Sequence, residues 1–201
     1  LGLKERPTTT RGKQAAAAIG RCDLMSIYDR FFSEYGYVPA QILITRDVID
    51  NEERRNNVIN TIEALLELDA IPVINENDSV SFEEILFGDN DRLSAIVADL
   101  SGADGLVIMT DIDGYYDSNP KENEDARLIG RVKEITDEMI DAAGGTGSNR
   151  GTGGMRTKLE AARFATDRGI AVVVMSGENP ALLYDLFDGH SVGTYFEAKN
   201  R

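Results

Sequence analysis

The hydrophobic positions of the 201-residue chain follow two patterns, helical spacing in some segments and short continuous runs in others. Apolar residues spaced three or four apart mark amphipathic helices. Short continuous apolar runs match strands that are buried on both faces. The pattern predicts helices over residues 8–35, 52–68, 91–100, 136–143, 155–168 and 180–187. It predicts strands over residues 38–45, 71–75, 105–109, 170–175 and 194–196.

The predicted helices and strands alternate along the chain, which is typical of an α/β fold with a mostly parallel sheet. We expect a three-layer α/β/α sandwich and a single domain over residues 1–201. Residues 111–125 are rich in turn-forming types, and residues 128–135 are predicted to form a small hairpin arm or excursion. Ligands of such folds bind beyond the carboxyl ends of the strands, so the site residues are expected there.

Composition narrows the possible functions. A content of 42% hydrophobic and 28% charged residues is typical of a soluble globular protein. The net charge of −14, from 21 basic and 35 acidic residues, argues against a nucleic-acid partner, because phosphate contacts need clustered Lys and Arg. The apolar runs are all too short to span a membrane. A bound polyphosphate would have to be neutralised locally, by a few basic groups or a metal ion.

Two residue types occur once each. A single cysteine, Cys22, excludes an internal disulfide and is predicted to be a buried thiol. A single histidine, His190, lies between glycine and serine and is predicted to be a surface loop residue. With no second histidine, triad hydrolases and His-rich metal sites lose most of their support.

Two short Asn/Asp boxes stand out, residues 75–78 (Asn-Glu-Asn-Asp) and residues 88–91 (Gly-Asp-Asn-Asp). The first closes a predicted strand, and the second opens a predicted helix with Asp89 as its N-cap. A strand end and a helix N-terminus together supply carboxylates, amides and backbone N–H groups, which suit a small zwitterion or a phosphate. Asn and Asp are also ordinary turn and capping residues, so this simpler explanation stays open for each box.

A substrate with one ammonium group and two carboxylates would explain the residue types of the two boxes. Asp78 can accept hydrogen bonds from the ammonium, while Asn75 and Asn90 can donate to carboxylates. An acidic side chain near a polyphosphate would repel it. We therefore expect Asp91 to be paired with a lysine or to face a magnesium shell.

The glycine-rich segment 144–158 ends as a helix begins. Glycine lets backbone N–H groups turn toward a phosphate, and a helix N-terminus adds its dipole. Lys158, about one turn into that helix, can offset charge during phosphoryl transfer. The spacing is neither that of a Walker A loop nor that of a dinucleotide motif, and a surface loop is the alternative. Thr110 and Asp111 end a predicted strand and can contact a nucleotide, whereas Asp113-Gly114 is predicted to be a plain turn.

Four runs of this sequence resemble, in the same order, those of the glutamate 5-kinase family, a member of the amino acid kinase superfamily. The runs are residues 71–78, 87–95, 110–114 and 151–158. Residues 13–15 and 191–194 are similar to that family as well. The resemblance covers essentially the whole chain, and the four runs together are far more specific than any one of them.

The resemblance implies an amino acid kinase fold and ATP-dependent phosphorylation of the side-chain carboxylate of L-glutamate. The product would be glutamyl 5-phosphate, made with Mg2+ in the cytoplasm as the first step of proline biosynthesis. Asn75, Asp78 and Asn90 resemble glutamate-binding residues. Asp91 resembles the aspartate that organises the catalytic lysines, of which Lys158 would be the transition-state lysine. The residues that resemble the ATP site are Thr110, Asp111, Gly153, Gly154, Met155, Arg156, Thr157 and Lys158. No residue is assigned to a metal. Feedback by proline and assembly into dimers or tetramers are further implications.

The chain departs from that family at its ends. The family begins with a strand that bears a lysine and a Gly-Ser-Ser turn, followed by a strand with a Ser-rich turn, and neither is found before Leu1. We therefore expect a kinase domain that lacks its N-terminal strands, without the RNA-binding-like PUA domain that follows in many relatives. Two alternatives stay open: a non-catalytic fragment that binds a ligand or oligomerises, and a sister kinase that phosphorylates acetylglutamate, aspartate or UMP.

Overall fold

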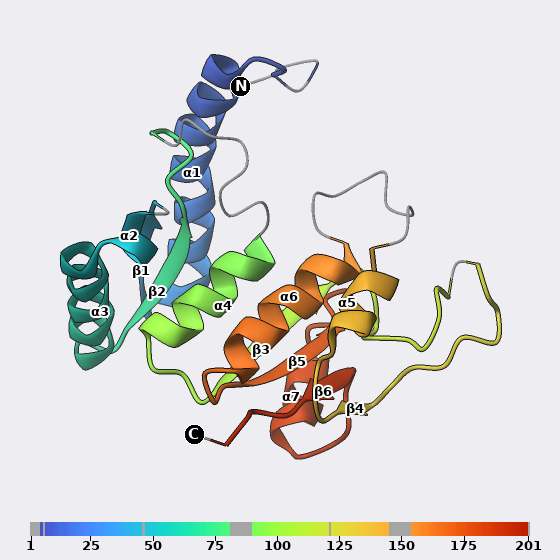
Figure 1. Ribbon diagram of the computed structural model, residues 1–201. Coiled ribbons are helices and arrows are strands. Elements are labelled where there is room, and N and C mark those ends of the chain that lie inside the picture. Colours follow the sequence, from blue (N-terminus) through green and yellow to red (C-terminus); the bar gives the residue numbers. More distant parts are fainter. Residues whose placement is uncertain are drawn as a thin grey trace. The chain divides into compact units, whose positions relative to one another are not determined.

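The computed structural model describes residues 5, 7–45, 47–80, 90–120, 122–144 and 154–200. The chain forms two compact units, residues 1–87 and residues 88–201, and each unit has its own sheet (Figure 1). Gly88, Asp89 and Gly153, for which the sequence makes predictions, lie outside the described residues.

Among its described residues, the first unit has three helices and two strands. Its elements are α1 (Thr10–Ser33), β1 (Val38–Ile44), α2 (Asp47–Asp50), α3 (Glu52–Glu67) and β2 (Ala70–Glu76). Thr9 caps α1, because its Oγ1 accepts from the backbone N–H of Gly12 at 3.1 Å. The chain leaves α1 through Gly36, whose φ of 79° lies in the left-handed region that glycine adopts readily.

The two strands of the first unit are parallel, with Val38 opposite Ala70 and Ile44 opposite Glu76. Helices α2 and α3 supply the crossover that parallel strands require. Beyond the paired residues, the backbone N–H of Asn77 donates to the carbonyl of Ile44 at 2.8 Å. The box at residues 75–78 therefore emerges at the carboxyl ends of both strands.

The second unit holds a four-stranded sheet of order β3-β5-β6-β4. Its strands are β3 (Gly105–Thr110), β4 (Arg131–Val132), β5 (Ala171–Ser176) and β6 (Thr194–Phe196), and its helices are α4 (Asn90–Leu100), α5 (Asp137–Ala142), α6 (Met155–Thr166) and α7 (Leu182–Phe187). β3 pairs with β5 and β4 pairs with β6 in parallel, whereas β5 and β6 are antiparallel.

Helices α4 and α6 pack side by side against this sheet through small residues (Figure 1). The buried positions that they contribute include Ala95 and Ala98 from α4 and Ala161, Ala162 and Ala165 from α6. Alanine adds little width, so the two helix backbones can approach closely. Larger apolar side chains of the core come from the strands and connections, among them Ile108, Ile170, Val172, Val174 and Phe196. The helices add Ile140 from α5 and Leu159 from α6.

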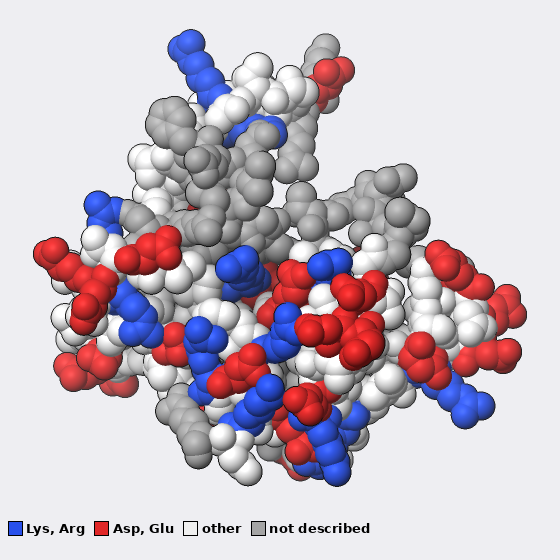
Figure 2. All heavy atoms as spheres, in the orientation of Figure 1, with Lys and Arg blue, Asp and Glu red and all other residues white. Residues whose placement is uncertain are grey.

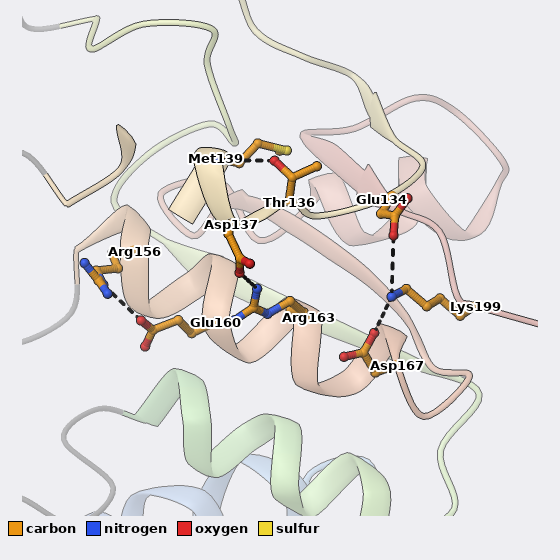
Figure 3. A network of polar contacts seen from close by, with 9 residues as sticks. All are labelled: Glu134, Thr136, Asp137, Met139, Arg156, Glu160, Arg163, Asp167 and Lys199. Carbon is orange, nitrogen blue, oxygen red and sulfur yellow. Dashed lines mark hydrogen bonds and ion pairs between the residues drawn. The ribbon is translucent and has the colours of Figure 1, made fainter. Parts of the chain in front are cut away.

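Ion pairs on the surface of the second unit fasten its C-terminal segment to α6 (Figure 3). Nζ of Lys199 lies 2.8 Å from Asp167 and 3.7 Å from Glu134, and the Lys199 backbone N–H donates to the carbonyl of Thr166. The hydrogen bond with Asp167 raises the pKa of Lys199. On the face drawn in Figure 2, basic and acidic side chains are intermixed.

Most of the predicted elements are present, with differences in two places. The helix α2 was not predicted. In the region predicted as a hairpin arm, an isolated antiparallel bridge joins Tyr116 to Leu128, but the strand that follows, β4, belongs to the four-stranded sheet of the second unit.

Cys22 is exposed, so its prediction as a buried thiol is wrong. His190 is exposed, which confirms that prediction.

The position of Cys22 follows from the face that α1 buries. Neighbouring residues of a helix point about 100° apart, so Arg21 and Cys22 do not share a face. Arg21 is the buried residue of α1, and Met25, Tyr28 and Phe32 on the same face are partly buried.

Within the described part of the chain, no helix is both long and apolar enough to cross a membrane.

Candidate active site

The second unit gathers two helix N-termini at one edge of its sheet. Helix α4 leads into β3 and helix α6 leads into β5 through short connections, so both helices run antiparallel to these parallel strands. The first turns of α4 and α6 therefore lie at the carboxyl ends of β3 and β5. This is the edge at which α/β proteins bind their ligands.

A buried ion pair joins the two first turns. Nζ of Lys158 lies 3.0 Å from Oδ2 of Asp91, with 8% and 11% of the two side chains exposed. Asp91 lies one turn before Ala95, and Lys158 one turn before Ala162, so the ion pair continues the alanine contact between the helices. The pairing of Asp91 with a lysine, expected from the sequence, is found; the catalytic roles stay predictions.

Thr157 supports the ion pair from the same turn of α6. Its Oγ1 lies 3.2 Å from Oδ2 of Asp91 and 2.9 Å from the carbonyl oxygen of Gly154. A hydroxyl has one hydrogen, so Thr157 donates to one of these acceptors at a time. When it donates to Asp91, the same carboxylate oxygen receives two hydrogen bonds from adjacent residues. Such a bond limits the rotation of the carboxylate that holds Lys158.

The start of α6 suits a phosphate group. Gly154 is the N-cap residue, and among the described residues no side chain caps this helix. The first turn of a helix has backbone N–H groups without partners inside the helix, and its dipole favours an anion. Met155 is partly buried against the core, whereas Arg156 is exposed and pairs with Glu160 at 2.9 Å (Figure 3).

Thr110 and Asp111 lie where the sequence predicted, at the carboxyl end of β3. Oγ1 of Thr110 donates to Oδ1 of Asp111 at 3.1 Å, and its carbonyl oxygen accepts from the backbone N–H of Gly177 at 2.6 Å. Just beyond β3 and β5 lies a cavity of about 440 Å³, lined by Asp113, Ser176 and Leu182 among others. Sequence reasoning missed this cavity, because its walls come from five separate segments of the chain, at residues 113, 128, 176, 182–185 and 190–193.

The box at residues 75–78 is held by its own backbone and by a residue that sequence reasoning missed. Oδ1 of Asn75 accepts from the backbone N–H of Glu76 at 2.8 Å. The guanidinium of Arg21 forms an ion pair with Asp78 and donates to the backbone carbonyl of Glu76. A signal for Arg21 was available: it lies four residues before Met25 and seven before Tyr28, so a cation shares the apolar face of the helix.

The two boxes belong to different compact units. Asn75 and Asp78 lie in the first unit, and Asn90 and Asp91 open α4 in the second. Asn90 is exposed, and Asp91 is buried. That the two boxes share one pocket stays a prediction.

The described residues offer no ready-made metal cage, since no three His, Cys, Asp or Glu side chains among them are grouped. Mg2+ in phosphoryl-transfer enzymes is usually bound through one or two carboxylates and the phosphates of the substrate. The residues present thus fit a metal ion that arrives with a nucleotide. Asp111, just beyond the carboxyl end of β3, has an exposed carboxylate of the type that such an ion binds.

Comparison with known proteins identifies the family of the chain. A model of the amino acid kinase family matches residues 1–176. The chain is 55% identical to the glutamate 5-kinase of Clostridium perfringens over 203 residues, covering 99% of this chain and 76% of that protein. It is 52% identical to the glutamate 5-kinase of Geobacillus kaustophilus, covering 97% of this chain but only 52% of that protein. These identities confirm the resemblance that the four sequence runs indicated.

Solved structures show the same fold at low sequence identity. A UMP kinase from Bacillus anthracis covers 98% of this chain, and the chain covers 72% of it, with a TM-score of 0.61 and 15% identity. An isopentenyl phosphate kinase from T. acidophilum covers 89% of this chain, and the chain covers 67% of it, with a TM-score of 0.58 and 20% identity. The predicted α/β class with a mostly parallel sheet is confirmed. With a family match over most of its length, the chain belongs to the amino acid kinase family.

Proposed function

We propose that the protein carrying this chain is a glutamate 5-kinase, which transfers the γ-phosphoryl group of ATP to the side-chain carboxylate of L-glutamate. The single observation that carries the proposal is the buried Lys158–Asp91 pair at the adjoining N-termini of α4 and α6. The choice of glutamate as acceptor is supported by about 50% identity to relatives that bear this name.

The proposed reaction needs positioning and charge stabilisation, with no covalent intermediate on the protein. An oxygen of the glutamate side-chain carboxylate forms a bond to the γ-phosphorus, and the bond from that phosphorus to the oxygen of the leaving ADP breaks. The attacking carboxylate is ionised near neutral pH, so no general base is required. The protein therefore contributes mainly by holding both reactants in line and by offsetting negative charge.

Each residue at the N-termini of α4 and α6 has a distinct part in this proposal. The Lys158 ammonium offsets the charge that builds up on the transferred phosphoryl group. Asp91 keeps that ammonium in place and Thr157 restrains Asp91. The backbone N–H groups that follow Gly154 hold phosphate oxygens, and Thr110 and Asp111 contact the nucleotide side of the site.

The remaining assignments rest on the family. Asn75, Asp78 and Asn90 are proposed to recognise glutamate. Mg2+ is proposed to accompany ATP and to neutralise its phosphates. Feedback inhibition by proline, assembly into a homo-oligomer and a cytoplasmic location are proposed for the whole protein on the same ground.

The proposal is tested by measuring ADP release by the intact protein with ATP, Mg2+ and L-glutamate. Acetylglutamate, aspartate and UMP serve as competing acceptors, and hydroxylamine traps the acyl phosphate product. We expect release that depends on L-glutamate above the other acceptors. A greater turnover with another acceptor would replace glutamate in the proposal, and no turnover with any of them would favour a ligand-binding module.

Lys158→Ala tests the carrying observation directly. Removal of one group that stabilises transition-state charge typically lowers kcat by about 10²–10³-fold. Lys133→Ala, which alters an exposed lysine beside β4, is the matched control and should leave kcat unchanged. Circular dichroism establishes that both variants fold. If the Lys158→Ala variant folds and its kcat is unchanged, Lys158 does not stabilise charge in the transition state.

A further inference from the structure

Arg21 is a buried cation whose hydrogen bonding is incomplete. It is 9% exposed, and its Nη2 donates both to the backbone carbonyl of Glu76 and to Oδ2 of Asp78. The second terminal nitrogen, Nη1, is fully buried. Among the described residues it is the one buried side-chain nitrogen or oxygen atom without a hydrogen-bond partner.

An unpaired N–H on a buried guanidinium is unfavourable, because the group has lost its water and gained nothing in exchange. Native proteins satisfy the great majority of such groups, and each exception calls for an explanation, of which a functional role is one. Here the exception lies beyond the carboxyl ends of β1 and β2, next to a box of polar residues. A ligand that accepts a hydrogen bond from Nη1 would complete the set.

The charges around Arg21 select the chemistry of that ligand. Asp78 already neutralises the guanidinium, so a phosphate beside both groups would be repelled by the carboxylate as much as it is attracted. A group with adjacent positive and negative charges fits instead. Its carboxylate would accept from Nη1 of Arg21, and its ammonium would donate to Asp78, whose side chain is 52% exposed.

We infer that Arg21 and Asp78 together recognise the α-carboxylate and the α-ammonium of the acceptor amino acid. The inference rests on the proposed function and deepens it, because it assigns the head group of glutamate to an oppositely charged pair. Arg21 is then a specificity-determining residue. Its planar fork holds Asp78 with one nitrogen and receives the substrate with the other, which a lysine ammonium cannot reproduce.

The test compares L-glutamate with 4-aminobutyrate, which lacks the α-carboxylate and keeps the reacting carboxylate. In the intact unchanged protein we expect kcat/KM for 4-aminobutyrate to be at least 100-fold lower. Where its turnover is too slow to follow, its inhibition constant against glutamate gives the same comparison. Similar values for the two compounds would overturn the inference without any variant being made.

Arg21→Met removes the guanidinium and keeps an unbranched side chain. We expect kcat/KM for glutamate to fall about 100-fold through KM, while the values for 4-aminobutyrate and the KM for ATP change less than threefold. Arg21→Lys should behave in the same direction with a smaller loss for glutamate, and it serves if the Met variant does not fold. Arg11→Met is the matched control, because Arg11 is an exposed arginine on the same helix. It should change kcat/KM for neither glutamate nor 4-aminobutyrate.

The outcomes separate the two proposals. Equal losses for glutamate and 4-aminobutyrate in the Arg21 variants would show that Arg21 only holds Asp78 in place, and would overturn the inference while leaving glutamate phosphorylation intact. No loss for either compound would overturn it as well. A lack of glutamate-dependent ADP release in the unchanged protein would instead overturn the proposed function.

Discussion

Nζ of Lys158 and Oδ2 of Asp91 lie 3.0 Å apart, and this contact joins the first turns of two helices through residues 67 positions apart in the sequence. The contact exists because small residues bring α4 and α6 together and because each charge continues the packed face of its helix. Removing one partner of a buried ion pair is strongly destabilising, because it leaves the other charge buried without compensation. The stability of the second unit therefore depends on the same contact as the chemistry proposed for Lys158.

Asp91→Asn should destabilise the protein strongly. The substitution keeps the side-chain volume but leaves Lys158 buried without its counter-charge, and breaking a buried pair in this way costs about 3–5 kcal/mol. Urea unfolding followed by circular dichroism measures the loss. Lys158→Met should also destabilise, and the double variant should lose about 0.5–3 kcal/mol less than the sum of the single losses. Simple additivity would show that the two charges do not interact.

Thr157→Val should lower kcat while Thr157→Ser preserves it. Valine has the shape of threonine but cannot donate to Asp91, so the carboxylate would lose one of the groups that orient it. Loss of one such positioning hydrogen bond corresponds to about 1 kcal/mol, or roughly a fivefold change in rate. Steady-state kinetics of the three proteins measure it. Equal kcat values for the Val and Ser variants would show that the hydroxyl serves only Gly154.

The sequence predicted helices α1, α3, α4, α5 and α6 well because their periodic apolar faces are strong local signals. The two-residue strand β4 has no such signal. It exists because Arg131 and Val132 pair with Tyr195 and Phe196 in the folded chain. The four-residue helix α2 is likewise too short to show a period.

The candidate site divides in the same way. The motifs single out Asp91 and Lys158, and the need for a counter-charge predicts either a lysine or a magnesium shell beside Asp91. That this lysine is Lys158 depends on two helices packing together, which spacing along the chain does not encode. The contact of Arg21 with Asp78 spans 57 residues and depends on which face α1 buries. The alternative face, with Leu24, Ile27 and Phe31, is equally apolar in sequence but is exposed in the structure.

Thr194→Val should destabilise the loop after β3. Thr194 is fully buried, and its Oγ1 accepts from the backbone N–H of Tyr115 at 2.8 Å. Valine fills the same space but leaves that N–H without its partner, at a cost of about 1–3 kcal/mol. Thr194→Ser keeps the acceptor and should lose only about 0.8 kcal/mol for the missing methyl group. Urea unfolding and the hydrogen-exchange rate of the Tyr115 amide check both values, and a more stable Val variant would contradict them.

Gly193→Ala should be far more damaging than Gly189→Ala. Both glycines have positive φ, 61° and 85°, so each alanine costs about 1–2 kcal/mol for the left-handed conformation. A Cβ at Gly193 would also lie 2.1 Å from the carbonyl oxygen of Val174, whereas one at Gly189 would meet nothing within 4 Å. Backbone atoms of a packed strand cannot easily give way. Thermal unfolding should therefore place the Gly193 variant well below the Gly189 variant, and equal midpoints would contradict the close approach.

Thr136→Ala should weaken the start of α5 in a pH-dependent way. Thr136 caps this helix, since its Oγ1 accepts from the backbone N–H of Met139 at 3.3 Å, and loss of such a cap costs about 1 kcal/mol. The pKa of Glu138 is lowered from its usual value of 4.5 by a hydrogen bond from the Thr136 side chain and by a second one from the backbone of Glu138 itself. A carboxylate whose pKa is lower in the folded state than in the unfolded state stabilises the fold at pH values above the unfolded-state pKa. This contribution is lost as the pH falls through the folded-state pKa. The difference in the free energy of unfolding between the wild type and the Thr136→Ala variant should therefore be largest at pH 7 and should shrink below about pH 4. Urea unfolding across that range measures it, with Thr136→Ser as the control that keeps the cap, and a difference that stays constant with pH would disconnect Glu138 from Thr136.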